Sequence, residues 1–363
     1  MDVWALAARD NIPIANAINL ILKLILILLL SYYFIKIIYS PKKLQQKLLI
    51  EVDLRDASQE KRRGSSQLQY SISKVLPYET KNCKFMPVKE IEPTNETIYK
   101  KEVDYFLISD PVMEEQTYDK WKFYNKTNSL LFGPIFLPHI WNKFPNNKFW
   151  NERRYREILQ SIKAELVHSE RVRDHLLTRS NNQDLINKVI IFRACTHNLP
   201  KYIKPFKERE VDIMLYEKFA DNNHKKQAKE LYNLLRSTNK RIEILKYGHY
   251  NQQYQFQLAN NTKFVIYFSF YDTGALSLKE IQNYGVISFS LQKDLVISDK
   301  TSYFIPELEN NDMTTAFNKI IKIIDNISNN NPDSTMIAKI NQELNYCEKA
   351  LDDLCENIIK KER

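Results

Sequence analysis

Apolar and polar residues alternate in several ways along the chain, and the first distinct pattern is a long apolar run near the N-terminus. Residues 24–35 carry no charge, and Lys23 and Lys36 stand at the two ends of this stretch. As a helix, 17–39 would be about 34 Å long, enough for a hydrocarbon layer of about 30 Å. The pattern predicts one transmembrane helix over 17–39, after a short non-cytoplasmic segment, 1–16.

The flanks of this run decide between competing interpretations. A cleaved signal peptide and a buried core helix are the alternatives, but a signal peptide needs a basic start, and the chain begins Met-Asp-Val-Trp. Lysines follow the run between 41 and 47, so the positive-inside rule places the C-terminal part in the cytoplasm. We therefore expect a single-pass membrane protein with a cytoplasmic domain, in which Lys36 snorkels and Lys23 snorkels or lies at a helix–helix contact.

Two polar or aromatic segments come next. Residues 40–67 form a basic juxtamembrane linker, which starts with a short basic helix, "KKLQQKLLIEV", and has no apolar periodicity over 55–67. Residues 68–150 hold short strand-like runs among aromatic residues. A basic, aromatic tract begins near Asp119 and predicts a surface that binds anionic lipid or nucleic acid. Solvated lysines around an irregular core are the alternative. The candidate anion-binding residues are Lys120, Lys122, Lys143, Lys148, Arg153, Arg154 and Arg156.

Residues 151–310 read as a long helix followed by an α/β domain. Apolar residues recur at helical spacing from 151 to 180, and strand-like runs such as "EVDIMLYE" and "RIEILKY" then alternate with amphipathic helices. The run "QYQFQLANNTKFVIYFSF" predicts a hairpin with an Asn-rich turn. Together these patterns predict a cytosolic α+β or α/β region with a mixed sheet.

A helical hairpin is expected over 311–363, with its loop at "SNNNP" and a cap at Asp333 or Ser334. In the second helix, apolar residues from Ile337 to Ile358 keep a 3-4 spacing over three heptads. This spacing predicts either self-association through a coiled coil or packing against the rest of the chain. A homo-oligomer through this helix or the transmembrane helix is therefore a candidate partner.

The amino-acid composition excludes several kinds of functional site. The 363 residues have a net charge of +9, and none of the 4 cysteines forms a C-x-x-C pair, which is too sparse for a disulfide framework and fits a reducing compartment. With 5 glycines, the chain has no glycine-rich phosphate loop. No metal site and no cofactor are predicted.

The element order over 187–326 resembles one repeat of the phospholipase D-like fold. In that family a hairpin carries H-x-K, and "QFQL" lies at the corresponding place here, while "GVISFS" resembles the following strand. The resemblance implies that Gln255 replaces the nucleophilic histidine and Gln257 the phosphate-binding lysine. Because a glutamine amide is neither nucleophile nor cation, it implies a degenerate site.

Other catalytic candidates are isolated residues. His249 lies near this segment, and Cys195 and His197 would share one face of a strand as a thiolate–imidazole pair. Structural roles are the alternative for all three.

The sequence thus favours a membrane-anchored, non-enzymatic binding, regulatory or assembly protein with a cytosolic degenerate phospholipase D-like domain. The alternatives are a hydrolase acting on phosphodiesters or lipids at the membrane, and an effector that oligomerises in the bilayer through its transmembrane helix.

Overall fold

The chain divides into two compact units, Met1–Lys47 and Leu48–Arg363. The structure, a computed structural model, describes residues 22–23, 25–29, 31, 47–54, 65–88, 103–108, 118–135, 152–174, 187–197, 199–218, 222–269 and 275–362.

The predicted transmembrane helix is the first expectation that the structure overturns. Within the described part of the chain, no helix combines the length and the apolar character that crossing a membrane requires. The described residues between 22 and 31 are helical and exposed, Lys23 among them, whereas Lys36 lies outside the described residues. The single-pass topology over 17–39, and the membrane location with a cytoplasmic C-terminal domain that followed from it, are therefore wrong.

The second unit contains two β-sheets. The first sheet has seven strands in the order β2-β3-β1-β4-β5-β6-β7. All neighbours in it pair in parallel except β2 with β3. The strands are β1 (Leu48–Asp53), β2 (Tyr78–Glu79), β3 (Cys83–Val88), β4 (Tyr105–Ile108), β5 (Leu130–Ile135), β6 (Ala164–Val167) and β7 (Val189–Ile191).

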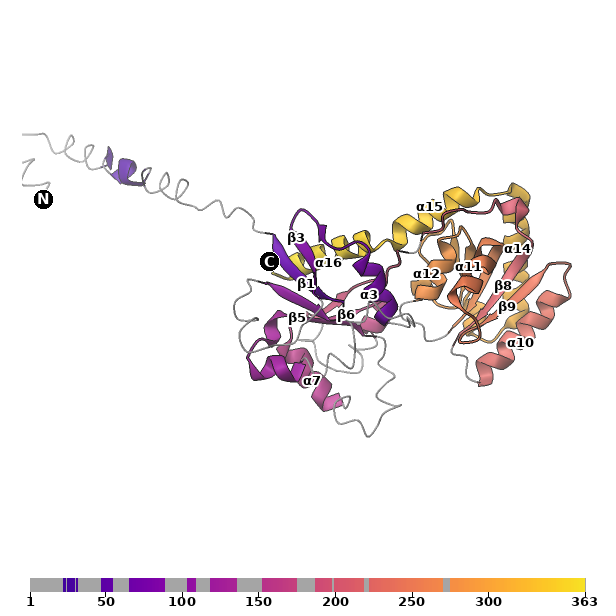
Figure 1. The fold of residues 1–363 in the computed structure, drawn as a ribbon, viewed down its shortest axis with the longest axis horizontal. Coiled ribbons are helices and arrows are strands. Elements are labelled where there is room, and N and C mark those ends of the chain that lie inside the picture. Colours follow the sequence, from indigo (N-terminus) through magenta and orange to yellow (C-terminus); the bar gives the residue numbers. More distant parts are fainter. Residues whose placement is uncertain are drawn as a thin grey trace, which may run out of the picture. The chain divides into compact units, whose positions relative to one another are not determined.

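The second sheet has five strands in the order β12-β11-β10-β8-β9, and every pair in it is parallel. Figure 1 labels two of its strands, β8 and β9. The predicted mixed sheet is therefore wrong: the described strands form two sheets with predominantly parallel pairing. The strands are β8 (Val211–Glu217), β9 (Ile242–Lys246), β10 (Thr262–Phe268), β11 (Ile287–Ser290) and β12 (Ser302–Phe304).

Helices cover both faces of each sheet, and the period-2 pattern of the strands divides each core into two clusters. In β8, Ile213 and Leu215 pack under α10 (Asn222–Arg236) and α14 (Met313–Asn330). Their neighbours Met214 and Tyr216 face α11 (Gln252–Asn260) and α12 (Leu276–Gln282) instead. Burial on both faces explains why these strands read as nearly continuous apolar runs.

The first sheet is covered in the same way. One face packs against α3 (Ser65–Ser73) and α16 (Cys347–Glu362). The other packs against α7 (Glu152–Ser161) and helical residues 118–123. Short elements complete the unit: η1 (Thr127–Ser129), η2 (Phe206–Glu208), η3 (Lys293–Leu295) and α13 (Pro306–Glu309).

The long helix expected over 151–180 is not continuous in the structure. It ends with α7 at Ser161, residues Ala164–Val167 form β6 and are all buried, and the chain is helical again at residues 170–174. A short apolar run satisfies a helical period by coincidence, and only the pairing of β6 between β5 and β7 shows that this one is a central strand.

The hairpin expected around Gln255 is also wrong. Residues 252–260 form α11, whose first turn is capped by Asn251 through its side-chain oxygen, which accepts the Tyr254 N–H at 2.7 Å. Only the second half of the segment is a strand, β10. Gln255 and Gln257 consequently lie on a helix rather than at a strand pair.

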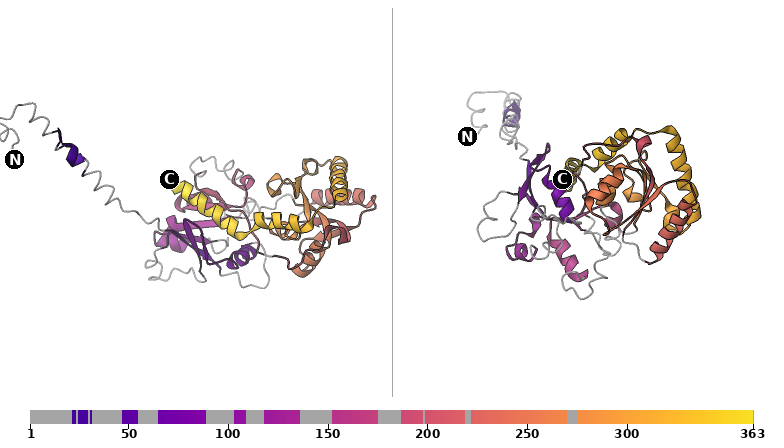
Figure 2. Two further views of the ribbon diagram at one scale, coloured as in Figure 1. Left: turned by 90° about the horizontal axis from the view of Figure 1, so that it is seen from above. Right: turned by 45° about the vertical axis from the view of Figure 1, so that its right-hand side comes forward.

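The C-terminal helices do not form a hairpin. Helix α14 packs on α10, α15 (Ser334–Asn345) packs on α12, and α16 packs against β7, as Figure 1 and the two views of Figure 2 show for the yellow helices. Asp333 caps α15 through the Thr335 N–H at 2.8 Å, as expected. The apolar residues of the heptad pattern, including Leu351 and Ile358, are buried within the chain, and self-association stays a prediction.

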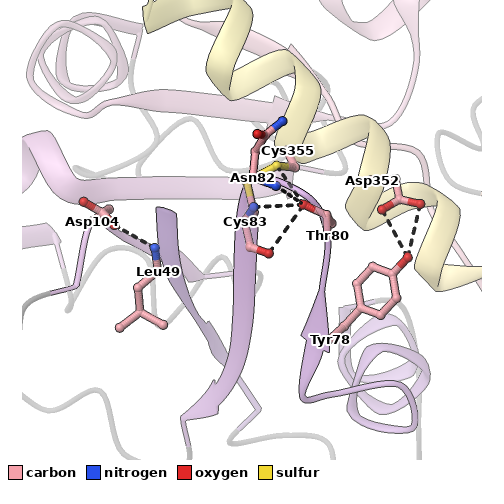
Figure 3. The surroundings of a disulfide bond; sticks show 8 residues. All are labelled: Leu49, Tyr78, Thr80, Asn82, Cys83, Asp104, Asp352 and Cys355. Carbon is pink, nitrogen blue, oxygen red and sulfur yellow. Dashed lines mark hydrogen bonds between the residues drawn. A yellow bond between two sulfur atoms is a disulfide. The ribbon is translucent and has the colours of Figure 1, made fainter. Parts of the chain in front are cut away.

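Two disulfides tie α16 to the first sheet. Cys355 pairs with Cys83 in β3, and Cys347 pairs with Cys195, which follows β7. Figure 3 shows the first disulfide, with Thr80 beside it, and the Tyr78 hydroxyl donating to Asp352 at 3.1 Å further along α16. All 4 cysteines are thus disulfide-bonded. The expectation that the cysteines are too sparse for a disulfide framework is therefore wrong. Such bonds persist where the environment is oxidising.

The second sheet is held to its surroundings by a buried arginine. The Arg209 guanidinium donates to the carbonyl oxygens of Thr262 at 2.6 Å and Tyr284 at 2.5 Å, and its Nε donates to the Lys204 carbonyl at 3.0 Å. Burial lowers the pKa of Arg209 to about 10, so the group remains charged at neutral pH. It joins the chain entering β8 to β10 and to the turn after α12.

Candidate active site

The candidate site lies at the carboxyl ends of β8 and β9. The chain passes from β8 to β9 on one side and then to β10 on the other side of β8, so the strand order reverses at β8. In open parallel sheets, ligands bind in the crevice at such a switch point, outside the carboxyl ends of the strands. The residues that follow these strands are therefore the first candidates.

A buried carboxylate is the centre of the site. Glu280 in α12 is 4% exposed, and its Oε1 accepts hydrogen bonds from the amides of Gln252 at 3.1 Å and Gln67 at 2.5 Å. Its Oε2 accepts the Gln255 amide at 3.4 Å. Burial raises the pKa of Glu280 to about 7, and the three glutamines and Lys218 oppose that rise. Glu280 thus exchanges a proton near neutral pH while surrounded by neutral donors.

The positive charge of the site comes from Lys218. Lys218 directly follows β8, is 8% exposed, and lies over the Tyr247 ring with its Nζ 5.1 Å from the ring centre. A lysine buried at the end of a central strand provides a point charge for an anionic ligand group.

Aromatic hydroxyls line the same edge. The Tyr216 and Tyr250 hydroxyls are hydrogen-bonded to each other at 2.5 Å, and the Tyr216 ring stacks on Tyr267. The pKa of Tyr250 is raised, chiefly by burial, so its phenol keeps its proton at neutral pH. At the end of β10, the buried Ser269 hydroxyl has no hydrogen-bond partner among the described residues. The edge therefore offers neutral hydroxyls next to one cation and one carboxyl.

The two sheets meet at this site. Gln67 belongs to α3, so its bond to Glu280 links the lobe of the first sheet to the lobe of the second. Arg171, which follows β6, donates to the Gln292 Oε1 at 2.7 Å, and the Gln292 amide donates to the Ser269 carbonyl at 2.7 Å. Lys279 reaches the Ala194 carbonyl. The site is therefore an interlobe site, built from both halves of the second unit.

The structure separates most of the predicted site residues. Of the degenerate-site pair, Gln255 belongs to the Glu280 cluster and Gln257 is exposed. His249 is exposed in the loop after β9, between Tyr247 and Tyr250. Cys195 is not a nucleophile because it is disulfide-bonded, and no described contact brings His197 to the site.

The predicted anion-binding residues lie on the first lobe. Lys120 and Lys122 are exposed on helical residues 118–123, which pack with α7 in one cluster. Arg153, Arg154 and Arg156 belong to α7, whereas Lys143 and Lys148 lie outside the described residues.

Sequence reasoning missed Glu280 and Lys218. One signal for Glu280 was present, because it stands four residues after Leu276, on the apolar face of a short helix. Carboxylates are rarely buried without a role or a partner. Within the described residues, no three His, Cys, Asp or Glu side chains are grouped as metal ligands would be.

Comparisons with known proteins identify the class of fold. No protein-family model and no curated protein matches the chain. Among solved structures, the catalytic domain of starch synthase IV from Arabidopsis thaliana, bound to ADP and acarbose, is similar with a TM-score of 0.51 at 8% identity, covering 87% of this chain and 99% of that one. The lipopolysaccharide outer core galactosyltransferase WaaB in its apo form is similar with a TM-score of 0.50 at 11% identity, covering 87% and 100%.

These likenesses define the fold as the two-sheet GT-B fold of glycosyltransferases. They overturn the resemblance to the phospholipase D-like fold and the three functions predicted with it: the degenerate non-enzymatic binding protein, the phosphodiester or lipid hydrolase, and the bilayer effector. The fold is one that sugar-transferring enzymes have, so it gives no support to the expectation that leaned against an enzyme.

Proposed function

We propose that the protein is a glycosyltransferase that binds a nucleoside diphosphate sugar at the interlobe site. The observation that carries the proposal is that a buried lysine, Lys218, and a buried carboxyl, Glu280, lie near the switch point of a parallel sheet, close enough for the lysine to lower the pKa of the carboxyl. The GT-B fold supports it, since the two structural relatives are a starch synthase and a galactosyltransferase.

The two groups suit different parts of such a donor. The Lys218 ammonium would contact the diphosphate, whose negative charge grows as it leaves. The Glu280 carboxylate would accept hydrogen bonds from sugar or ribose hydroxyls, in exchange for one of the glutamine amides that it now binds. In the transfer, the bond between the sugar C1 and the phosphate oxygen breaks, the diphosphate leaves with the electron pair, and the acceptor hydroxyl bonds to C1 and loses its proton.

Binding of nucleoside diphosphates tests the site directly. We expect UDP, ADP or GDP to raise the thermal midpoint of the full chain, and Lys218→Ala to weaken that binding at least tenfold, since an ammonium–phosphate contact contributes about 1.5–3 kcal/mol. Lys207→Ala is the matched control, because Lys207 is exposed in η2, before β8 rather than after it. Release of nucleoside diphosphate from the matching sugar donor is then measured, and Glu280→Ala should reduce it.

Two results would contradict the proposal. One is that none of the three nucleotides or their sugar conjugates binds or is turned over by the wild-type chain. The other is that Lys218→Ala binds the nucleotide as tightly as the wild type.

A further inference from the structure

A cavity runs along α11, beside the segment between β7 and β8 that joins the two lobes, here called the interlobe linker. It has a volume of about 480 Å³ and opens widely to solvent. The linker residues 200–202 form one wall, and the exposed side of α11 forms the other. Cavities that hold small ligands have about 300–1,000 Å³, so this one accommodates several sugar rings or a compound of similar size.

The lining combines aromatic faces with amides. Tyr202, 62% exposed, stands on the linker side, while Phe256 and Tyr284 stack on each other with ring centres 5.8 Å apart. Gln253 and Gln257 stand one helical turn apart on α11 and are exposed. Aromatic faces pack against the C–H faces of sugar rings, and amides both donate to and accept from hydroxyl groups.

The lining of the cavity carries little charge. Lys201 is the one charged side chain among the described residues that line the cavity, and no carboxylate is among them. The other lining groups are neutral amides, aromatic rings and a proline, so a neutral polyhydroxylated ligand fits the lining. At the end of the cavity near Asn260, the linker is hydrogen-bonded to the last turn of α11: the Lys204 backbone N–H donates to Asn260 Oδ1 at 2.9 Å.

The cavity shares one lining residue with the candidate active site. Gln252 lines it and also donates to Glu280 at 3.1 Å. From this residue the cavity follows α11 away from the site, towards Asn260. We infer that it is a binding subsite for a neutral oligosaccharide, occupied by the part of a glycan acceptor that extends beyond the reacting sugar. The role of this oligosaccharide as a glycan acceptor rests on the proposed function. The binding of an oligosaccharide in the cavity does not depend on that function.

Oligosaccharide binding to the full chain without any donor tests the inference. The probes are neutral oligosaccharides of four to seven sugars, with α-1,4-, β-1,4- and β-1,3-linked glucose, measured by calorimetry and by saturation-transfer NMR. We expect at least one to bind, and Tyr202→Ala and the double variant Gln253→Ala/Gln257→Ala to weaken it at least fivefold each. Tyr254→Ala is the matched control, since Tyr254 is a 45% exposed tyrosine of α11 that does not line the cavity.

The outcomes separate this inference from the proposed function. Failure of all three series to bind the wild type overturns the subsite, and so does binding that Tyr202→Ala leaves unchanged or that Tyr254→Ala weakens equally. Each of these results leaves nucleotide binding at Lys218 untouched. Conversely, oligosaccharide binding with the expected losses, in a chain that binds no nucleotide, supports the subsite and contradicts the transferase. Circular dichroism of each variant confirms that it is folded.

Discussion

Gly285 shows how one residue depends on a distant part of the chain. It lies in the turn between α12 and β11 with a φ of +73°, and a Cβ there would meet the Ser334 carbonyl oxygen of α15 at 2.2 Å. Both backbone conformation and space therefore require glycine at this position. The Arg209 guanidinium, bonded to the carbonyls of Tyr284 and Gly285, holds the same turn from the other side.

Replacing Gly285 should destabilise the fold strongly. We expect Gly285→Ala to lower the free energy of unfolding by about 3 kcal/mol or more, because α15 must shift to admit the methyl group. Gly248→Ala is the control: Gly248 has a φ of +83°, but a Cβ at this position would have no atom within 4 Å, so only conformational strain of about 1 kcal/mol applies. Urea unfolding of both variants measures the difference, and equal losses would refute the steric argument.

Glu280 should make stability depend on pH. Its pKa in the folded chain, about 7, is above the ordinary value of 4.5, so between these values the unfolded chain has released a proton that the folded chain keeps. Stability is therefore highest below the lower value and falls as pH rises towards the upper one, by at most about 3 kcal/mol.

Glu280→Gln removes this dependence because its amide does not titrate. Urea unfolding from pH 4.5 to 7 should show a flatter profile for Glu280→Gln than for the wild type. Glu309→Gln, at an exposed position in α13, should keep the wild-type slope. A wild-type profile in Glu280→Gln would show that the carboxyl is ionised at all of these pH values.

At the scale of elements, α16 is the last helix of the chain, yet it completes the core of the first sheet. Leu351, Leu354 and Ile358 are buried against that sheet, and each contributes about 1.5–3 kcal/mol by leaving water. The Cys83–Cys355 bond closes a sequence separation of 272 residues, and the Cys195–Cys347 bond one of 152. Bonds over such distances restrict the unfolded chain most.

Removing the Cys83–Cys355 disulfide should destabilise the fold. We expect Cys83→Ser/Cys355→Ser to lower the free energy of unfolding by roughly 4 kcal/mol, and dithiothreitol to destabilise the wild type further. Thiol titration of the unreduced, denatured chain checks the pairing: no thiol should react before reduction, and all 4 cysteines after it. Four reactive thiols in the protein isolated under oxidising conditions would contradict both bonds.

Elements also show where sequence patterns are ambiguous. The runs that became β8 and β10 were recognisable because both faces of each strand are buried, which leaves unbroken apolar residues over 213–216 in β8 and over 264–268 in β10. By contrast, β6 has four residues, and its leucine falls in register with the helix before it. Short segments take their conformation from their neighbours in the sheet, and the sequence does not contain those pairings in readable form.

At the scale of the whole molecule, part of the basic, aromatic tract noted in the sequence lies exposed on the first lobe. Phe123 is 80% exposed and follows Lys122, and both belong to helical residues 118–123 beside α7. The anion-binding role of this surface stays a prediction. An exposed phenylalanine among lysines is the arrangement that contacts anionic lipid headgroups.

Vesicle binding measures this prediction. Vesicles containing phosphatidylglycerol should bind the chain at low salt, with affinity that falls steeply as salt rises from about 50 to about 200 mM. Lys122→Glu should weaken binding more than fivefold, since each lysine near such a surface contributes about 1 kcal/mol. Lys229→Glu, at an exposed position of α10 on the second lobe, should have no comparable effect. Salt-independent binding, or none at low salt, would exclude the role.

The sequence by itself determined the elements whose pattern is local: the apolar runs of β8 and β10, the amphipathic α10 and α14, and a cap at either Asp333 or Ser334. These follow from periodicity and from side-chain to backbone bonds between near neighbours. Only the tertiary structure decided the disulfide pairs, the strand order, and the site in which Gln67, Lys218 and Glu280 meet. Those depend on contacts between residues far apart in the chain, and without them neither the fold nor the chemistry of the site was predictable.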